Sequence, residues 1–121
     1  MASQQEIKAI HKAFADFEQV PQKDMSKIME LSDKINKEKA ANVKKSLEIE
    51  LGALSMKIKK AAKSMEAAIA KVAKNIHKDD KSMNQELNNI QRHMKAMMPG
   101  KSNIKVTGKV SGNKMTVTVK P

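Results

Sequence analysis

The sequence contains no cysteine, tryptophan or tyrosine, and only two of its 121 residues are phenylalanine. Without cysteine the chain can form neither disulfides nor thiolate sites, although this does not fix its compartment. Aromatic side chains usually dominate the energetics of a core. Here the core must come from aliphatic residues and from ten methionines, which fill gaps flexibly. We therefore expect a helical protein packed mainly by alanine and methionine.

Long apolar runs are also missing. The opening segment MASQQEIKAIHKAFADFEQ contains no hydrophobic stretch of the signal-peptide kind. Nothing along the chain approaches the roughly 20 apolar residues that span a bilayer. These features predict one cytoplasmic domain.

Acidic residues are missing from one part of the chain. Residues 87–121 hold seven lysine or arginine residues and no acid, whereas residues 1–50 hold nine residues of each sign. The formal net charge is +11. This asymmetry favours an anionic partner for the basic end. The alternative is a lysine-rich surface that only aids solubility.

Helical periodicity covers most of the chain. Ser3 and Glu6 match the S-x-x-E capping box that starts a helix. Pro21 should interrupt this helix because proline lacks the amide hydrogen. Apolar residues then recur every three or four positions in the next segment. Residues 36–46 are mostly polar and form either an exposed helical stretch or a connection.

The longest pattern starts at Leu47, from which apolar residues alternate by four and three up to Val72. This is a heptad seam, and a flanking alanine-rich row widens it toward a multi-helix bundle. The seam is either an association surface between chains or an intramolecular core. As an assembly face it comprises Leu47, Leu51, Leu54, Ile58, Met65, Ile69 and Val72.

The last segment, NIKVTGKVSGNKMTVTVKP, changes to a period of two. Valines, Ile104 and Met115 fall on one face, and lysines and threonines on the other. Gly112-Asn113 favours a tight hairpin turn. A hairpin alone is marginal in water, so its apolar face should cover a helix, or its edges should pair with another chain.

The fold class predicted is mainly α, a helical bundle or coiled-coil-like set of about four helices followed by a C-terminal two-stranded antiparallel β-hairpin. The helical region 1–99 and the hairpin 103–120 belong to one domain. The helices are expected at 4–19, 22–36, 43–77 and 82–98. Whether residues 22–77 form one long helix or two stays open.

The segment AMMPGKSN contains the Gly-Lys-Ser that closes a phosphate-binding loop. Such a loop needs G-x-x-x-x-G-K-[ST] between a strand and a helix. Counting back from Gly100, the first glycine would fall at Lys95, and here a helix precedes the motif. Pro99-Gly100 is instead typical of a helix end.

The sequence contains no motif for catalysis or for metal binding. His11, His77 and His93 fall in separate segments. In HMKAMM, Met94 and Met97 lie on the apolar stripe of their helix, which favours a core role over a soft-metal site. With no cysteine and no nucleophile motif, the sequence predicts neither an enzyme nor a cofactor, metal or small-molecule site.

The leading functional interpretation is a non-enzymatic structural or interaction protein. It would assemble with itself or a protein partner through the seam, and its basic hairpin would contact an anionic or protein partner. The expected contacts with an anionic partner are Arg92, Lys95, Lys101, Lys105, Lys109, Lys114 and Lys120.

Three alternatives remain, and the first two use the same lysines. Lysines that neutralise phosphates bind nucleic acid without reading its sequence, although no aromatic residue is present there for stacking. An anionic membrane surface would use the same lysines. The third alternative is a small helical secretion-associated protein. The best-known such family carries a W-x-G turn, but this chain has no tryptophan, and its nearest segment, Leu51 to Leu54, is expected to be helical, so the sequence matches no such family.

Overall fold

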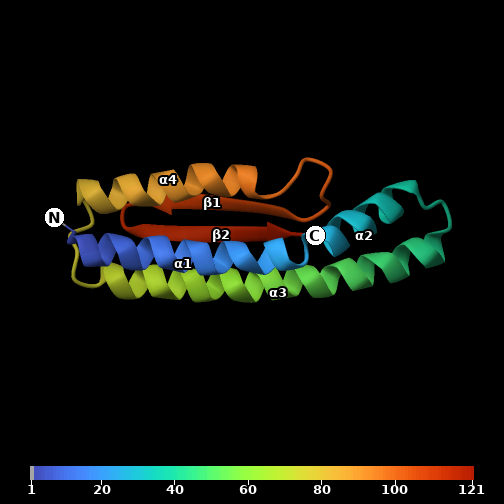
Figure 1. Cartoon of the computed structure of the whole chain (residues 1–121), viewed down its shortest axis with the longest axis horizontal. Coiled ribbons are helices and arrows are strands. Elements are labelled where there is room, and N and C mark those ends of the chain that lie inside the picture. The colour runs from blue at the N-terminus through green and yellow to red at the C-terminus, as the bar shows by residue number, and fades with distance from the viewer. Residues whose placement is uncertain (1) are drawn as a thin grey trace.

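The computed structural model describes residues 2–121, and these form four helices followed by a two-stranded antiparallel sheet, as predicted (Figure 1). The elements are α1 (Gln4–Lys23), α2 (Met25–Lys37), α3 (Ala41–Ala73), α4 (Lys81–Met97), β1 (Lys105–Ser111) and β2 (Lys114–Lys120).

The first helix starts as predicted and ends later than predicted. Ser3 Oγ accepts a hydrogen bond from the Glu6 amide, and the Ser3 amide donates to Glu6 Oε1, which completes the capping box. Pro21 does not end α1, which continues to Lys23. Proline costs one backbone hydrogen bond there, and burial of its ring in the core offsets that cost. The break between α1 and α2 therefore falls at Asp24.

A short turn separates α2 from α3, so residues 22–77 form two helices and not one. Glu38 Oε1 accepts from the Lys39 and Ala40 amides and so builds this turn. The 33 residues of α3 make a helix about 50 Å long. α3 ends at Ala73 instead of residue 77.

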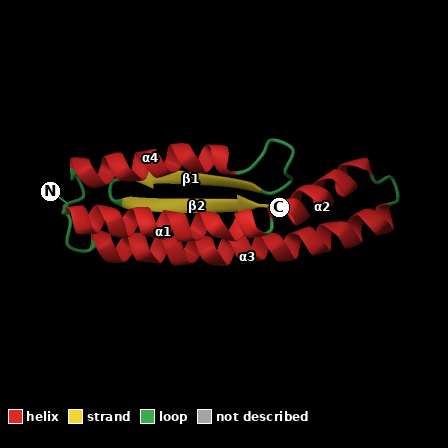
Figure 2. Ribbon diagram, viewed as in Figure 1, coloured by secondary structure: helices red, strands yellow, loops and turns green. Residues whose placement is uncertain are grey.

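The helices and the hairpin form a closed ring of packed elements. α1 contacts both α3 and α4, while β2 contacts α3 and β1 contacts α4. The hairpin thus occupies the place of the fourth helix in a four-helix bundle (Figure 2). The other end of α3 pairs with α2, and this helix pair projects past the end of the hairpin (Figure 1).

The hairpin covers the helices with its apolar face, one of the two arrangements expected. Val106, Met115 and Val119 are buried, while Val110 and Val117 are partly buried against the same core. Gly112 alone in the turn adopts a positive φ, of 58°. Asn113 instead donates its side-chain amide to the carbonyls of Ile76 and His77, at 3.1 and 2.7 Å. These bonds tie the turn to the segment that follows α3.

Candidate anion-binding face of the hairpin

The seam residues of α3 lie inside the single chain. Leu51, Ile58, Met65 and Ile69 are buried, and the other three pack against the same core: Leu47, Leu54 and Val72. These side chains therefore take the second of the two roles considered, that of an intramolecular core. Association through them would require the bundle to open.

Four of the seven lysine and arginine positions selected from the sequence share one exposed face of the hairpin. In the strand register Lys105 lies opposite Lys120, and Lys109 lies opposite Thr116. Ser111 lies opposite Lys114, and Thr107 lies opposite Thr118 next to the Lys105–Lys120 end of the ribbon. All eight outward-facing residues are exposed: Lys105, Thr107, Lys109, Ser111, Lys114, Thr116, Thr118 and Lys120.

The other three selected residues lie outside this ribbon. Arg92 and Lys95 are exposed on α4, the helix that packs against β1. The Arg92 guanidinium donates to the Asn89 side-chain oxygen. Lys101 is exposed in the connection between α4 and β1. Only the four hairpin lysines are therefore brought onto one face by the strand pairing itself.

Ion pairing differs between the two ends of the chain. Lysines of the helices pair with acids, as in Lys34–Glu30 at 2.9 Å and Lys57–Asp24 at 3.1 Å. The hydrogen bond from Lys34 lowers the pKa of the Glu30 carboxyl. Among residues 2–121, no acid pairs with any of the four hairpin lysines.

The opposed lysines carry an electrostatic cost. Like charges directly opposite one another on a sheet destabilise it, and Lys105 and Lys120 occupy such positions. The Lys105 ammonium donates to the Gly100 carbonyl at 3.0 Å. That bond leaves its charge unneutralised. A bound anion would relieve the repulsion.

The segment that resembles half a phosphate loop has a structural role. Ser102 is buried, and its hydroxyl accepts from the Ile104 amide and donates to the Ile104 carbonyl. The next amide, that of Asn103, donates to Ser32 Oγ at 2.9 Å. These bonds attach the connection after α4 to α2, and the hydroxyl is already engaged.

The histidines make separate structural contacts. His11 contacts Glu86 at 3.0 Å and so links α1 to α4. His93 stacks on Phe14 with ring centroids 6.4 Å apart. His77 lies 3.9 Å from Asp79. Within residues 2–121, no three His, Asp or Glu side chains are grouped as metal ligands.

The sequence matches no protein-family model, no curated protein and no solved structure. No helix in the described part of the chain has the length and hydropathy to cross a bilayer. Leu51 to Leu54 lies inside α3, so the segment nearest to a W-x-G turn is helical, as expected.

Proposed function

We propose that this chain is a non-enzymatic interaction protein that holds an anionic macromolecule against the exposed face of its hairpin. The observation that carries the proposal is the composition of that face, which has four lysines, three threonines, one serine and no acid. The helices support the hairpin from behind, because the apolar face of the hairpin is buried against the core. The polar face is therefore left free to contact a partner.

The phosphate backbone of a nucleic acid is the partner whose chemistry suits this face best. Lysine and the hydroxyls of serine and threonine are common ligands of backbone phosphates, and such contacts carry no sequence information. A two-stranded ribbon also has a shape that the major groove admits. The face has no aromatic side chain, which favours a duplex over stacked single strands.

Two variants with equal charge change test the proposal. In the first, Lys105, Lys109, Lys114 and Lys120 are all replaced by glutamine. In the control, glutamine replaces four exposed lysines outside the hairpin: Lys8, Lys12, Lys45 and Lys71. Fluorescence anisotropy with a labelled DNA duplex of about 20 base pairs is measured over a range of salt concentrations.

Binding of the hairpin variant should weaken at least tenfold at low salt. Each lost phosphate contact should also reduce the slope of log K against log salt by about 0.9. The control should keep the slope of the natural sequence. Equal losses in both variants would mean that only net charge matters and would overturn the proposal. Binding of an acidic peptide in place of the duplex at about 50 mM salt would assign the face to a protein partner.

A second candidate function is self-association along α3. Ile49 and Met56 are 68% and 62% exposed. They are seven residues apart, which is about two helical turns, so both lie on the same side of α3. Ala53 between them is also exposed and allows a close approach. Sedimentation at several concentrations tests this function. A dimer that Met56→Lys abolishes would support it, and a monomer at every concentration would contradict it.

A further inference from the structure

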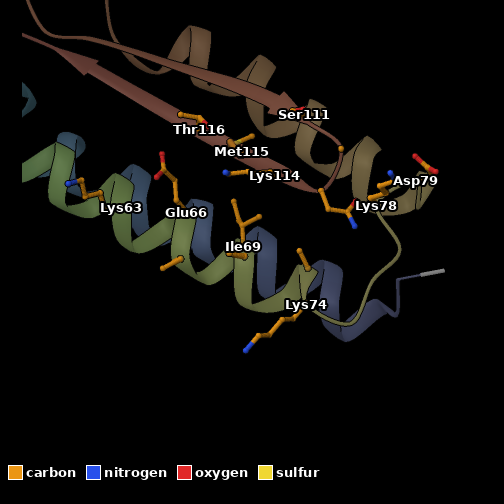
Figure 3. Close-up of a pocket in the computed structure, with 15 residues that line it drawn as sticks. Lys63, Glu66, Ile69, Lys74, Lys78, Asp79, Ser111, Lys114, Met115 and Thr116 are labelled. Atoms are coloured by element: carbon orange, nitrogen blue, oxygen red, sulfur yellow. The ribbon is translucent and has the colours of Figure 1, made fainter.

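A cleft of about 900 Å³ lies between α3 and the turn end of the hairpin. Figure 3 shows Glu66 and Ile69 pointing from α3 toward β2. The floor of the cleft is apolar and is formed by Ile69, Ala70, Ala73 and Met115. Its volume falls within the range of roughly 300–1,000 Å³ that is typical of small-molecule sites.

The strand edge supplies backbone donors to this cleft. Val117 donates its amide to Glu66 Oε1 at 2.6 Å, so this N–H points away from β1. Amides of an antiparallel edge strand alternate between the partner strand and the open side. The N–H of Met115, two residues earlier, therefore points in the same direction. Met115 also lines the cleft.

The cleft carries an excess of positive charge. Four lysines line it, namely Lys63, Lys74, Lys78 and Lys114. Within the described chain, none of them forms an ion pair. Of the two acids that line it, Glu66 is engaged by Val117 and Asp79 lies beside His77. Lys114 lies between β2 and α3, whereas Lys74 points away from the cleft (Figure 3).

We propose that this cleft binds a small amphipathic anion, an aliphatic chain with a single carboxylate. The aliphatic part lies along the alanine and isoleucine floor on α3, where it replaces water against apolar atoms. The carboxylate lies toward the turn end and is held by Lys78 and Lys114, with the Met115 amide as a further donor. This site differs from the hairpin face in its apolar floor and in Lys78, and the two share Ser111, Lys114 and Thr116.

Dodecanoate is a suitable probe, and dodecanol is its uncharged counterpart. The fluorescence of an anilinonaphthalene sulfonate tracer reports the displacement. The tracer is excited at wavelengths where no protein side chain absorbs, so it can also be followed in variants that contain tryptophan. Dodecanoate should displace the tracer at least tenfold more effectively than dodecanol. Equal displacement by dodecanoate and dodecanol would show that the lysines do not bind the carboxylate, and it would overturn the proposal.

Substitutions locate the site. Ala70 is exposed and lines the cleft, so Ala70→Trp should fill the cleft and weaken dodecanoate binding at least tenfold. Ala67 lines the cleft one helical turn earlier, so Ala67→Trp should also fill the cleft and serves as a second blocking variant. Ala96→Trp on α4 is the matched control. Circular dichroism verifies that each variant is folded.

Charge removal tests the polar end. Lys78→Gln together with Lys114→Gln should weaken dodecanoate at least fivefold and leave dodecanol unchanged. The same pair of changes at Lys8 and Lys12, on α1, should affect neither. Dodecanoate binding that persists in both folded cleft-filling variants would contradict the proposal, whatever the result for DNA.

Discussion

Gly108 of β1 packs against Met94 of α4 so closely that a β-carbon at position 108 would lie 2.9 Å from the methionine sulfur. This contact is where the hairpin approaches the helix that supports it. Met94 is fully buried, so its side chain has little space into which to move. A β-carbon at position 108 would therefore force the Met94 sulfur to shift, so packing favours glycine here. Backbone conformation does not, since Gly108 does not have a positive φ.

We predict that Gly108→Ala destabilises the protein by about 1–3 kcal/mol, the usual cost of overpacking a core. Met94→Ala alone should cost about 2–5 kcal/mol because it leaves a cavity. In the double variant the new methyl group occupies part of that cavity, so the two losses should not add. Urea unfolding of the four proteins measures this coupling. Simple additivity would show that the two side chains do not compete for space.

Gly52 offers the opposite prediction. It lies inside α3, and a β-carbon built there meets no atom within 4 Å. Gly52→Ala should therefore stabilise the protein by about 1 kcal/mol, since glycine is that much worse than alanine in a helix interior. Thermal unfolding followed by circular dichroism measures the change.

Gly112 provides the comparison for this prediction. Its φ of 58° is left-handed, and an L-residue pays roughly 1–2 kcal/mol there. Gly112→Ala should therefore lower the melting temperature where Gly52→Ala raises it. If Gly52→Ala also lowered it, the glycine in α3 would have a role that its open surroundings do not explain.

Glu66 fastens the free edge of β2 to α3. Glu66→Ala should cost about 1–2 kcal/mol because the Val117 amide loses its acceptor. Glu66→Gln keeps an acceptor oxygen and should lose less than half as much. Hydrogen exchange of the Val117 amide should become faster in the alanine variant only. Equal destabilisation by both substitutions would show that the negative charge matters, and not the hydrogen bond.

The sequence predicted which side chains are buried wherever apolar residues recur with a regular period. Alternation by two assigned Val106, Met115 and Val119 to the buried side of the hairpin, and the lysines to the exposed side. The seam of α3 was equally clear as a pattern. A heptad stripe has the same spacing whether its partner is a second chain or another helix of the same chain, so its role had to come from the fold.

Other features depend on contacts between distant parts of the chain. The cleft is lined by both Ile69 and Met115, which are 46 residues apart in the sequence. No local sequence pattern indicates that these two residues lie near each other. At Pro21 a local sequence preference gave a wrong prediction, because a contact with the core was not visible in the sequence. Its local preference predicted a helix end, but burial of its ring in the core outweighed the loss of one hydrogen bond. Tertiary packing decided both cases.

Asp80 makes stability depend on pH in the acid range. Its side chain caps α4 by accepting from the Met83 amide at 3.0 Å. This hydrogen bond lowers the pKa of the Asp80 carboxyl below its usual 3.8. The unfolded chain therefore binds this proton more readily than the folded one. The contribution of Asp80 to stability is complete above pH 3.8 and is lost as the pH falls through the folded pKa.

Asp80→Asn isolates this effect from the twelve other acids of the chain. Asparagine still offers an oxygen to the Met83 amide, and it is an equally common helix cap, but it does not titrate. Urea unfolding of both proteins at pH 6, 4 and 2 measures the difference in their unfolding free energies. That difference should favour the natural sequence at pH 6 and shrink toward pH 2. A difference independent of pH would mean that the capping carboxylate has the same affinity for protons in the folded and unfolded chains.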